Sequence, residues 1–102
     1  MNQTQQRQYL RFDVKIDVQI EYDDTIQPGT TVNMSQGGAL ISTSPTVDFG
    51  KRIILEIILP GIKEKCRIPS IVRWSKEGEG IGIQFESLRA IEVWAINRLK
   101  NS

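Results

Sequence analysis

Hydrophobic and polar residues alternate without a break from Phe12 to Tyr22. Every second residue is hydrophobic, and these residues are Phe12, Val14, Ile16, Val18, Ile20 and Tyr22. Hydrophobic residues at a period of two predict one antiparallel strand with a buried face and an exposed face. The pairs Asp23–Asp24 and Pro28–Gly29 follow this segment and predict turns.

Shorter segments along the rest of the chain predict further strands, over residues 30–35, 39–43, 52–59, 65–75 and 81–86. Gly37–Gly38 separates the first two, and consecutive glycines indicate positive φ angles or a close backbone approach. Residues 52–59 are nearly continuous in Ile and Leu, and their β-branched side chains favour a strand buried in a barrel. Pro69 predicts a bulge or an edge position inside its strand.

The period changes in the C-terminal segment. Leu88, Ile91, Ala95 and Leu99 recur at helical spacing, and Trp94 flanks this stripe. Ser87 precedes the stripe and is a suitable N-cap. We therefore predict a helix over about residues 88–100, with Trp94 packed against the mouth of the domain.

Together these elements predict an all-β fold with a C-terminal helix, in which six or seven antiparallel strands close into a small barrel. A chain of 102 residues has room for one domain. We assign residues 12–102 to that domain and residues 1–11 to a flexible basic arm, because the arm contains Arg7 and Arg11 and no acidic residue.

Composition excludes several classes of function. The chain has no histidine and one cysteine, Cys66, so the usual side chains for metal binding and for acid–base catalysis are missing. We expect Cys66 to be a buried, inert thiol, and we expect no enzyme activity and no metal. No run approaches the roughly 20 apolar residues of a membrane helix, and the N-terminus lacks a secretion signal. A cytoplasmic protein without membrane insertion is expected.

The first candidate binding motif is the pair Arg7 and Arg11. Each guanidinium offers a planar fork that fits a phosphate or the O6/N7 edge of guanine. In an extended segment the two could embrace a ligand up to about 13 Å across. The alternative interpretation is a solvated pair of charges at a frayed terminus.

The second candidate motif is Asn33-Met-Ser35-Gln-Gly37-Gly38 at the end of a predicted strand. We expect Val32 and Met34 to face the core, which would turn Asn33 and Ser35 to the opposite face together. Their amide and hydroxyl groups suit a base edge, and the glycines would let a flat base or sugar approach. The alternative is a turn in which Asn33 and Ser35 cap their own backbone.

The two motifs in this order resemble the paired signature of PilZ domains. Arg7-xxx-Arg11 is followed, after one long strand and a turn, by Asn33-x-Ser35-xx-Gly38. The segments 71–74 and 80–85 are similar to the closing strands of that family. The resemblance covers the chain from Arg7 to the final helix.

The resemblance implies a six-stranded antiparallel β-barrel that acts as a receptor for the bacterial second messenger cyclic di-GMP, without catalysis and without a cofactor. It implies that Arg7 and Arg11 hold phosphates and guanine Hoogsteen edges. It also implies that Asn33, Ser35 and Gly38 contact a second guanine and its ribose.

Trp74 is a further candidate, because it could stack on a purine. The alternative is a half-buried tryptophan of the barrel. As a single domain, the chain must signal through an unidentified downstream protein, and we expect the arm to order on binding and change a partner-facing surface. A nucleotide-independent protein-interaction module is the competing hypothesis. Binding to DNA or RNA is not expected, because the chain has 7% aromatic residues and a net charge of +1.

Overall fold

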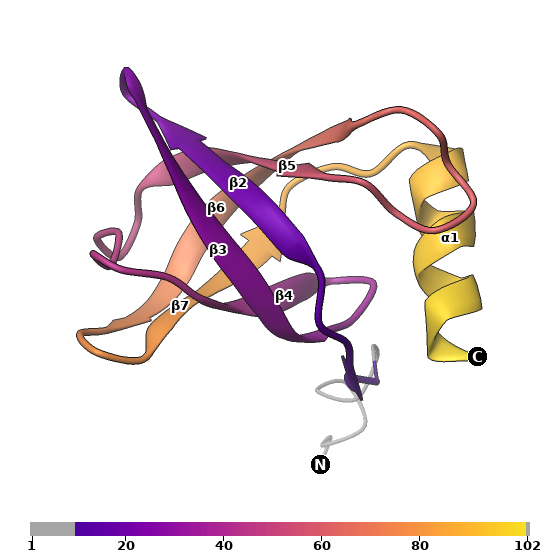
Figure 1. Ribbon diagram of the computed structural model, residues 1–102, viewed down its shortest axis with the longest axis horizontal. Helices are drawn as coiled ribbons and strands as arrows, with labels where there is room; N and C mark the ends of the chain where they lie inside the picture. The colour runs from indigo at the N-terminus through magenta and orange to yellow at the C-terminus, as the bar shows by residue number, and fades with distance from the viewer. Residues whose placement is uncertain (1–9, 102) are drawn as a thin grey trace, which may run out of the picture.

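Seven strands and one helix follow one another in the computed structural model, which describes residues 10–101 (Figure 1). In chain order these are β1 (Phe12–Asp13), β2 (Asp17–Tyr22), β3 (Thr25–Met34), β4 (Gly38–Ser42), β5 (Arg52–Ile57), β6 (Cys66–Lys76), β7 (Gly80–Phe85) and α1 (Ala90–Lys100). The predicted order of strands followed by a C-terminal helix is confirmed.

The strands close into an antiparallel barrel. Their order around it is β3-β2-β5-β6-β7-β4, and β4 pairs again with β3 to complete the ring. β1 pairs with the end of β3, where Phe12 lies opposite Met34 and Asp13 lies opposite Asn33. The prediction of a six-stranded antiparallel barrel is therefore confirmed.

Aliphatic side chains fill the barrel. The largest side chains that are fully buried include Ile20, Met34, Leu55, Ile68, Val72 and Ile81. They come from five strands, and β2, β5 and the first part of β6 alternate between more and less buried positions. This alternation is what the period of two in the sequence predicts.

Helix α1 stands at one end of the barrel, beside the loop between β5 and β6 (Figure 1). Its buried residues are Glu92, Ala95 and Ile96, whereas Ile91 and Trp94 are 49% and 46% exposed. The prediction that Ile91 belongs to the buried stripe was wrong, because the helix is rotated so that Ile96 faces the core. The N-cap is Arg89 and not Ser87.

The N-cap Arg89 is a charged residue, whereas the predicted cap, Ser87, is short and uncharged. Glu92 is 3% exposed and its carboxylate accepts hydrogen bonds from the Arg89 backbone N–H at 2.8 Å and from Arg89 Nη2 at 2.9 Å. The buried carboxylate lies in the first turn of α1, where the helix dipole favours a negative charge. This pair therefore fixes where α1 begins.

Two prolines lie inside strands, where each loses no ladder hydrogen bond. Pro28 was expected in a turn, but it lies in β3 opposite Gln19. Its carbonyl accepts a hydrogen bond from Thr43 Oγ1. Thr43 follows the last residue of β4, so the Pro28 nitrogen, on the same side of β3, faces no paired strand. Pro69 lies opposite Ile54 of β5 and one residue before the β6–β7 ladder begins at Ser70, so the prediction of a bulge or edge position was wrong.

Candidate functional site

Arg11 and Asn33 are joined across the start of the barrel. Arg11 Nη1 donates a hydrogen bond to Asn33 Oδ1 at 2.8 Å, although the two residues are 22 positions apart in the sequence. Arg11 immediately precedes β1, and β1 lies against the end of β3 that carries Asn33. The fold therefore brings together one residue from each predicted motif. Arg7 lies outside the described residues.

This contact changes the interpretation of the arm. The sequence placed Arg11 in a flexible segment, but the structure holds its guanidinium against Asn33. Phe12, the next residue, packs its partly buried ring against the barrel core. Arg11 is thus positioned by the fold on the outside of the barrel, with its remaining N–H groups available to an anion.

A β-bulge at Val32 turns Asn33 outward. Thr31 pairs with Ile41 and Asn33 pairs with Leu40, so Val32 is an extra residue in β3. Thr31 and Met34 are 2% and 1% exposed, whereas Val32 is 46% exposed. The prediction that Val32 faces the core was wrong, because the bulge shifts the alternation by one residue. The outward position of Asn33 is nevertheless the one predicted.

Ser35 does not share an open face with Asn33. Its side chain is buried, its backbone N–H donates to Gly38 O at 2.8 Å, and its Oγ accepts from the Gly37 N–H at 3.0 Å. This is the turn that the sequence offered as the alternative interpretation. The hydroxyl keeps its own proton, which remains available for donation.

Gly38 is required by a close approach of two strands. A Cβ atom at Gly38 would lie 2.0 Å from the carbonyl oxygen of Ile83 on β7. Gly38 has no positive φ, so of the two explanations in the sequence analysis the close approach is the correct one. The neighbour is a strand of the protein itself, and the Gly37 carbonyl accepts from the Phe85 N–H at 2.9 Å. The turn after Asn33 is therefore attached firmly to β7.

Trp74 is placed outward by a second bulge. Val72 pairs with Ile83 and Trp74 pairs with Gly82, so Arg73 is an extra residue in β6. Trp74 is 41% exposed, which supports the availability of its ring at the surface. Without the bulge, the alternation that buries Ser70 and Val72 would have buried Trp74 as well.

Strand pairing connects these two residues in one line across the barrel surface. Asn33 pairs with Leu40, Leu40 pairs with Gly82, and Gly82 pairs with Trp74. We call these four residues the outer row, and it spans three strand spacings, about 14 Å. Gly82 has no side chain, which lets Trp74 lie close against its backbone. A Cβ at Gly82 would lie 3.3 Å from the Trp74 Cβ. Leu40 and Gly82 were not predicted, since only strand pairing places them in the row.

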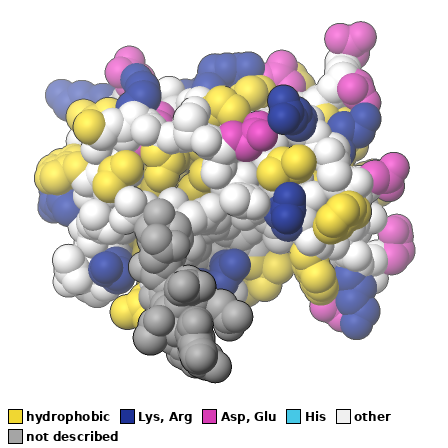
Figure 2. All heavy atoms as spheres, turned by 180° about the vertical axis from the view of Figure 1, so that it is seen from behind, with side chains coloured by type: hydrophobic (Ala, Val, Ile, Leu, Met, Phe, Trp, Pro, Cys, Tyr) yellow, Lys and Arg dark blue, Asp and Glu magenta, His cyan; other side chains and the backbone are white. Residues whose placement is uncertain are grey.

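Arg11 lies beside Asn33 at one end of the outer row, and Arg73 precedes Trp74 at the other. Arg11, Lys15 and Arg73 form no ion pair among residues 10–101, and Asp13 is the acidic residue paired across from Asn33. Figure 2 shows the side of the barrel behind the view of Figure 1, where basic and hydrophobic side chains are interspersed and most acidic ones lie toward the edges. Uncompensated cations around a shallow face favour an anionic ligand.

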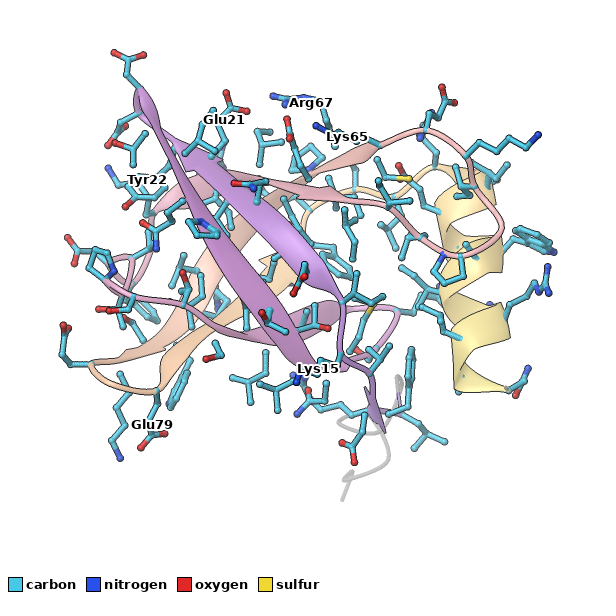
Figure 3. The ribbon with its side chains drawn as sticks, in the orientation of Figure 1. Lys15, Glu21, Tyr22, Lys65, Arg67 and Glu79 are labelled. Atoms are coloured by element: carbon cyan, nitrogen blue, oxygen red, sulfur yellow. The ribbon has the colours of Figure 1, made fainter. Side chains whose placement is uncertain are left out.

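The other end of β2 carries a neutralised cluster. Arg67 bridges Glu21 at 2.6 Å and Glu56, and Lys65 lies 3.8 Å from Glu56. The hydrogen bond to Glu21 raises the pKa of Arg67 above its usual value. In Figure 3, Lys15 lies far from this group, at the opposite end of the strand. Because these charges satisfy one another, the cluster offers no free cation to a ligand.

The described residues hold neither a metal-binding cluster nor an exposed thiol. Among residues 10–101 no group of three His, Cys, Asp or Glu side chains could hold a metal ion. Cys66 is fully buried, and desolvation raises the pKa of its thiol, which keeps it protonated. This agrees with the expectation of an inert thiol. No helix in the described part of the chain is long and apolar enough to span a membrane.

Comparison with known proteins agrees with this geometry. The family model of the PilZ domain matches residues 5–101. The PilZ domain of CeSA from a cellulose-synthesizing bacterium aligns with a TM-score of 0.66 and 20% identity over 88% of this chain and 93% of that chain. The Bacillus subtilis inhibitor of motility MotI/DgrA aligns with a TM-score of 0.71 and 22% identity over 100% of this chain. That alignment covers 53% of MotI, so this chain spans about half its length. A comparison with curated proteins found no match.

Proposed function

This chain belongs to the PilZ domain family, a family of cyclic di-GMP receptors, and we propose that it binds cyclic di-GMP on the outer row. The observation that carries the proposal is the hydrogen bond between Arg11 and Asn33. It brings Arg11 of the arginine motif beside Asn33 of the Asn-x-Ser-xx-Gly motif. PilZ domains are binding modules, and we propose no catalysis and no cofactor for this chain.

The chemistry of the side chains suits a cyclic dinucleotide. A guanidinium binds a phosphate or the Hoogsteen edge of guanine through two parallel hydrogen bonds, and we assign this role to Arg11 and Arg7. The Asn33 amide presents a donor and an acceptor to a base edge. Ser35 supports the site through its turn, which its hydroxyl holds by accepting from the Gly37 N–H, and Gly37 and Gly38 keep that turn free of side chains.

Trp74 completes the proposed site at the far end of the outer row. Its exposed indole offers a face on which a guanine can stack, and base–aromatic stacking contributes about 1–3 kcal/mol. The row is about 14 Å long, which is long enough for a base held near Asn33 and a second base near Trp74. Gly82 and Leu40 form the floor between them.

Binding would order the residues before Leu10 over the ligand and change the surface seen by a downstream protein. We propose a cytoplasmic location, because the messenger is made and read inside the bacterial cell. The two similar structures are the PilZ domain of CeSA from a cellulose-synthesizing bacterium and an inhibitor of motility. We propose that the downstream partner is a protein that binds the chain differently with and without the ligand.

Isothermal titration with cyclic di-GMP tests the proposal. We expect saturable binding to the unmodified chain and a loss of about tenfold or more in affinity for Arg11→Ala, from the usual strength of a charged hydrogen bond. Arg7→Ala and Ser35→Ala should also weaken binding. Arg52→Ala is the matched control, because Arg52 is exposed on β5 and contacts only Glu86 at 3.5 Å.

Absence of binding at tens of micromolar ligand would reject the proposal. It would favour the competing hypothesis, an interaction module that does not respond to the nucleotide. Equal losses in Arg52→Ala and Arg11→Ala would show that general charge, and not the outer row, attracts the ligand.

A further inference from the structure

The long alternating segment Phe12–Tyr22 is interrupted between β1 and β2, and a single buried side chain bridges the interruption. Residues 14–16 belong to no strand. The Thr31 hydroxyl accepts a hydrogen bond from the Ile16 N–H at 2.8 Å and donates one to the Val14 carbonyl at 2.6 Å. Thr31 is 2% exposed, so water cannot replace either bond.

The interruption has a local cause. Asp13 lies opposite Asn33 and Asp17 lies opposite Thr30, so the three residues 14–16 face only residues 31 and 32 of β3, and the extra residue interrupts the regular ladder. Two backbone bonds remain, from Thr31 N to Ile16 O at 2.9 Å and from Val14 N to Val32 O at 3.3 Å. The Thr31 side chain supplies the partners that the ladder would otherwise have given to Ile16 N and Val14 O.

β1 has little else to hold it in place. It contains two residues, Phe12 and Asp13, and pairs only with Met34 and Asn33. Arg11 is the residue before β1, and its side chain reaches Asn33. A shift of β1 along or away from β3 would therefore move Arg11 from its position beside Asn33.

We propose that Thr31 is a positioning residue for the anion site: its buried hydroxyl holds Val14 and Ile16, and through β1 it places Arg11 at Asn33. The inference rests on the proposed function for its effect on the ligand. Thr31 does not touch the ligand, since its side chain faces the barrel interior. A hydroxyl at this position is what the proposal requires, and not merely a side chain of this size.

The test compares Thr31→Val, which keeps the shape and loses the hydroxyl, with Thr31→Ser, which keeps the hydroxyl. Thr43→Val is the matched control. Thr43 is also a buried threonine whose hydroxyl makes two bonds, accepting from Gln27 Nε2 at 2.8 Å and donating to Pro28 O at 2.8 Å. It lies beyond the last residue of β4, away from β1.

We expect Thr31→Val to bind cyclic di-GMP up to about tenfold more weakly, because Arg11 would no longer be held at Asn33 and the loss approaches that of Arg11→Ala. Thr31→Ser and Thr43→Val should bind within about twofold of the unmodified chain. In an Arg11→Ala background, Thr31→Val should cause little further loss, because two residues that act through the same contact are not additive.

A second readout needs no ligand. In the free protein, Thr31→Val should speed amide hydrogen exchange at Ile16 and shift the NMR signal of Arg11 Nε toward that of a free guanidinium. Thr43→Val should leave both signals unchanged. If Thr31→Val does not fold, Phe12→Ala releases β1 from its other contact and should produce the same Arg11 signal.

Three results would overturn the inference. The first is a Thr31→Val variant in which amide hydrogen exchange at Ile16 is faster but the affinity for cyclic di-GMP is unchanged. The second is an equal loss of affinity in the Arg11→Ala background. The third is an unchanged Arg11 signal in free Thr31→Val. If the unmodified chain binds no cyclic di-GMP, the proposed function fails, and the Arg11 signal alone still decides the role of Thr31.

Discussion

Asn33 and Trp74 reach the outer face of the barrel by the same means, a β-bulge at the residue before each of them. The bulge at Val32 lies in β3, and the bulge at Arg73 lies in β6. Each adds one residue to a strand of period two, so each reverses the side to which the next residue points. Leu40 and Gly82 connect the two residues in one row.

Trp74→Ala should weaken cyclic di-GMP binding by about 1–3 kcal/mol, because it removes the stacking surface at the end of the row. Titration calorimetry measures the loss. Trp94→Ala is the matched control, since Trp94 is similarly exposed but lies on α1, where the Arg98 guanidinium covers its ring at 4.9 Å. An equal effect of both variants would remove Trp74 from the site.

The cations around the outer row should make binding depend on salt. Lys15→Ala and Arg73→Ala should each reduce affinity by a few-fold at low ionic strength, and the effect should diminish as added salt screens these exposed charges. Arg67→Ala serves as the control, because Glu21 and Glu56 already neutralise its charge. Affinity that does not change with salt would argue against the electrostatic part of the site.

Gly38→Ala should destabilise the fold by about 3 kcal/mol or more, because overpacking here forces two backbones apart. A Cβ at Gly38 would approach Ile83 O to 2.0 Å. Gly50→Ala is the comparison, since Gly50 has φ +88° and no atom within 4 Å of its added Cβ. Its cost should be about 1–2 kcal/mol, that of a left-handed residue alone. Urea denaturation measures both, and equal costs would contradict the proposed clash.

Stability should fall at alkaline pH through Cys66. Burial raises the pKa of its thiol above the ordinary value of 9.0. Above that value the unfolded chain loses the proton while the folded chain keeps it, so the folded state binds more protons and stability decreases as pH rises. Cys66→Ala removes this contribution. Denaturation from pH 7 to pH 10 should show a smaller decrease for the variant, and parallel curves would exclude Cys66 as the cause.

The location of the strands followed directly from local pattern, but their interruptions did not. Alternation over Phe12–Tyr22 predicted one strand, whereas the structure has β1, a gap at residues 14–16 and β2. The hydrophobic residues alternate through the gap, because Val14 and Ile16 still pack against the core. The gap arises because residues 14–16 stand opposite only residues 31 and 32 of β3, a register that depends on the partner strand and cannot be read from the alternation.

In the candidate site, too, local sequence predicted some features and strand pairing decided others. The types and spacing of Arg7, Arg11, Asn33, Ser35 and Gly38 indicated a family and a ligand. They did not indicate that Ser35 is occupied by its own turn, or that Gly38 is needed for β7. Those facts depend on strands that are distant in the sequence.

By itself, the sequence determined that this protein is a barrel with a C-terminal helix, because a period of two and a period near 3.6 are local properties of the chain. It also predicted which side chains would contact a nucleotide. Only the tertiary structure decided that Arg11 meets Asn33 and that Asn33 and Trp74 share one face. Strand pairing and register set those positions, and a single extra residue in one strand changes which side chains its neighbours meet.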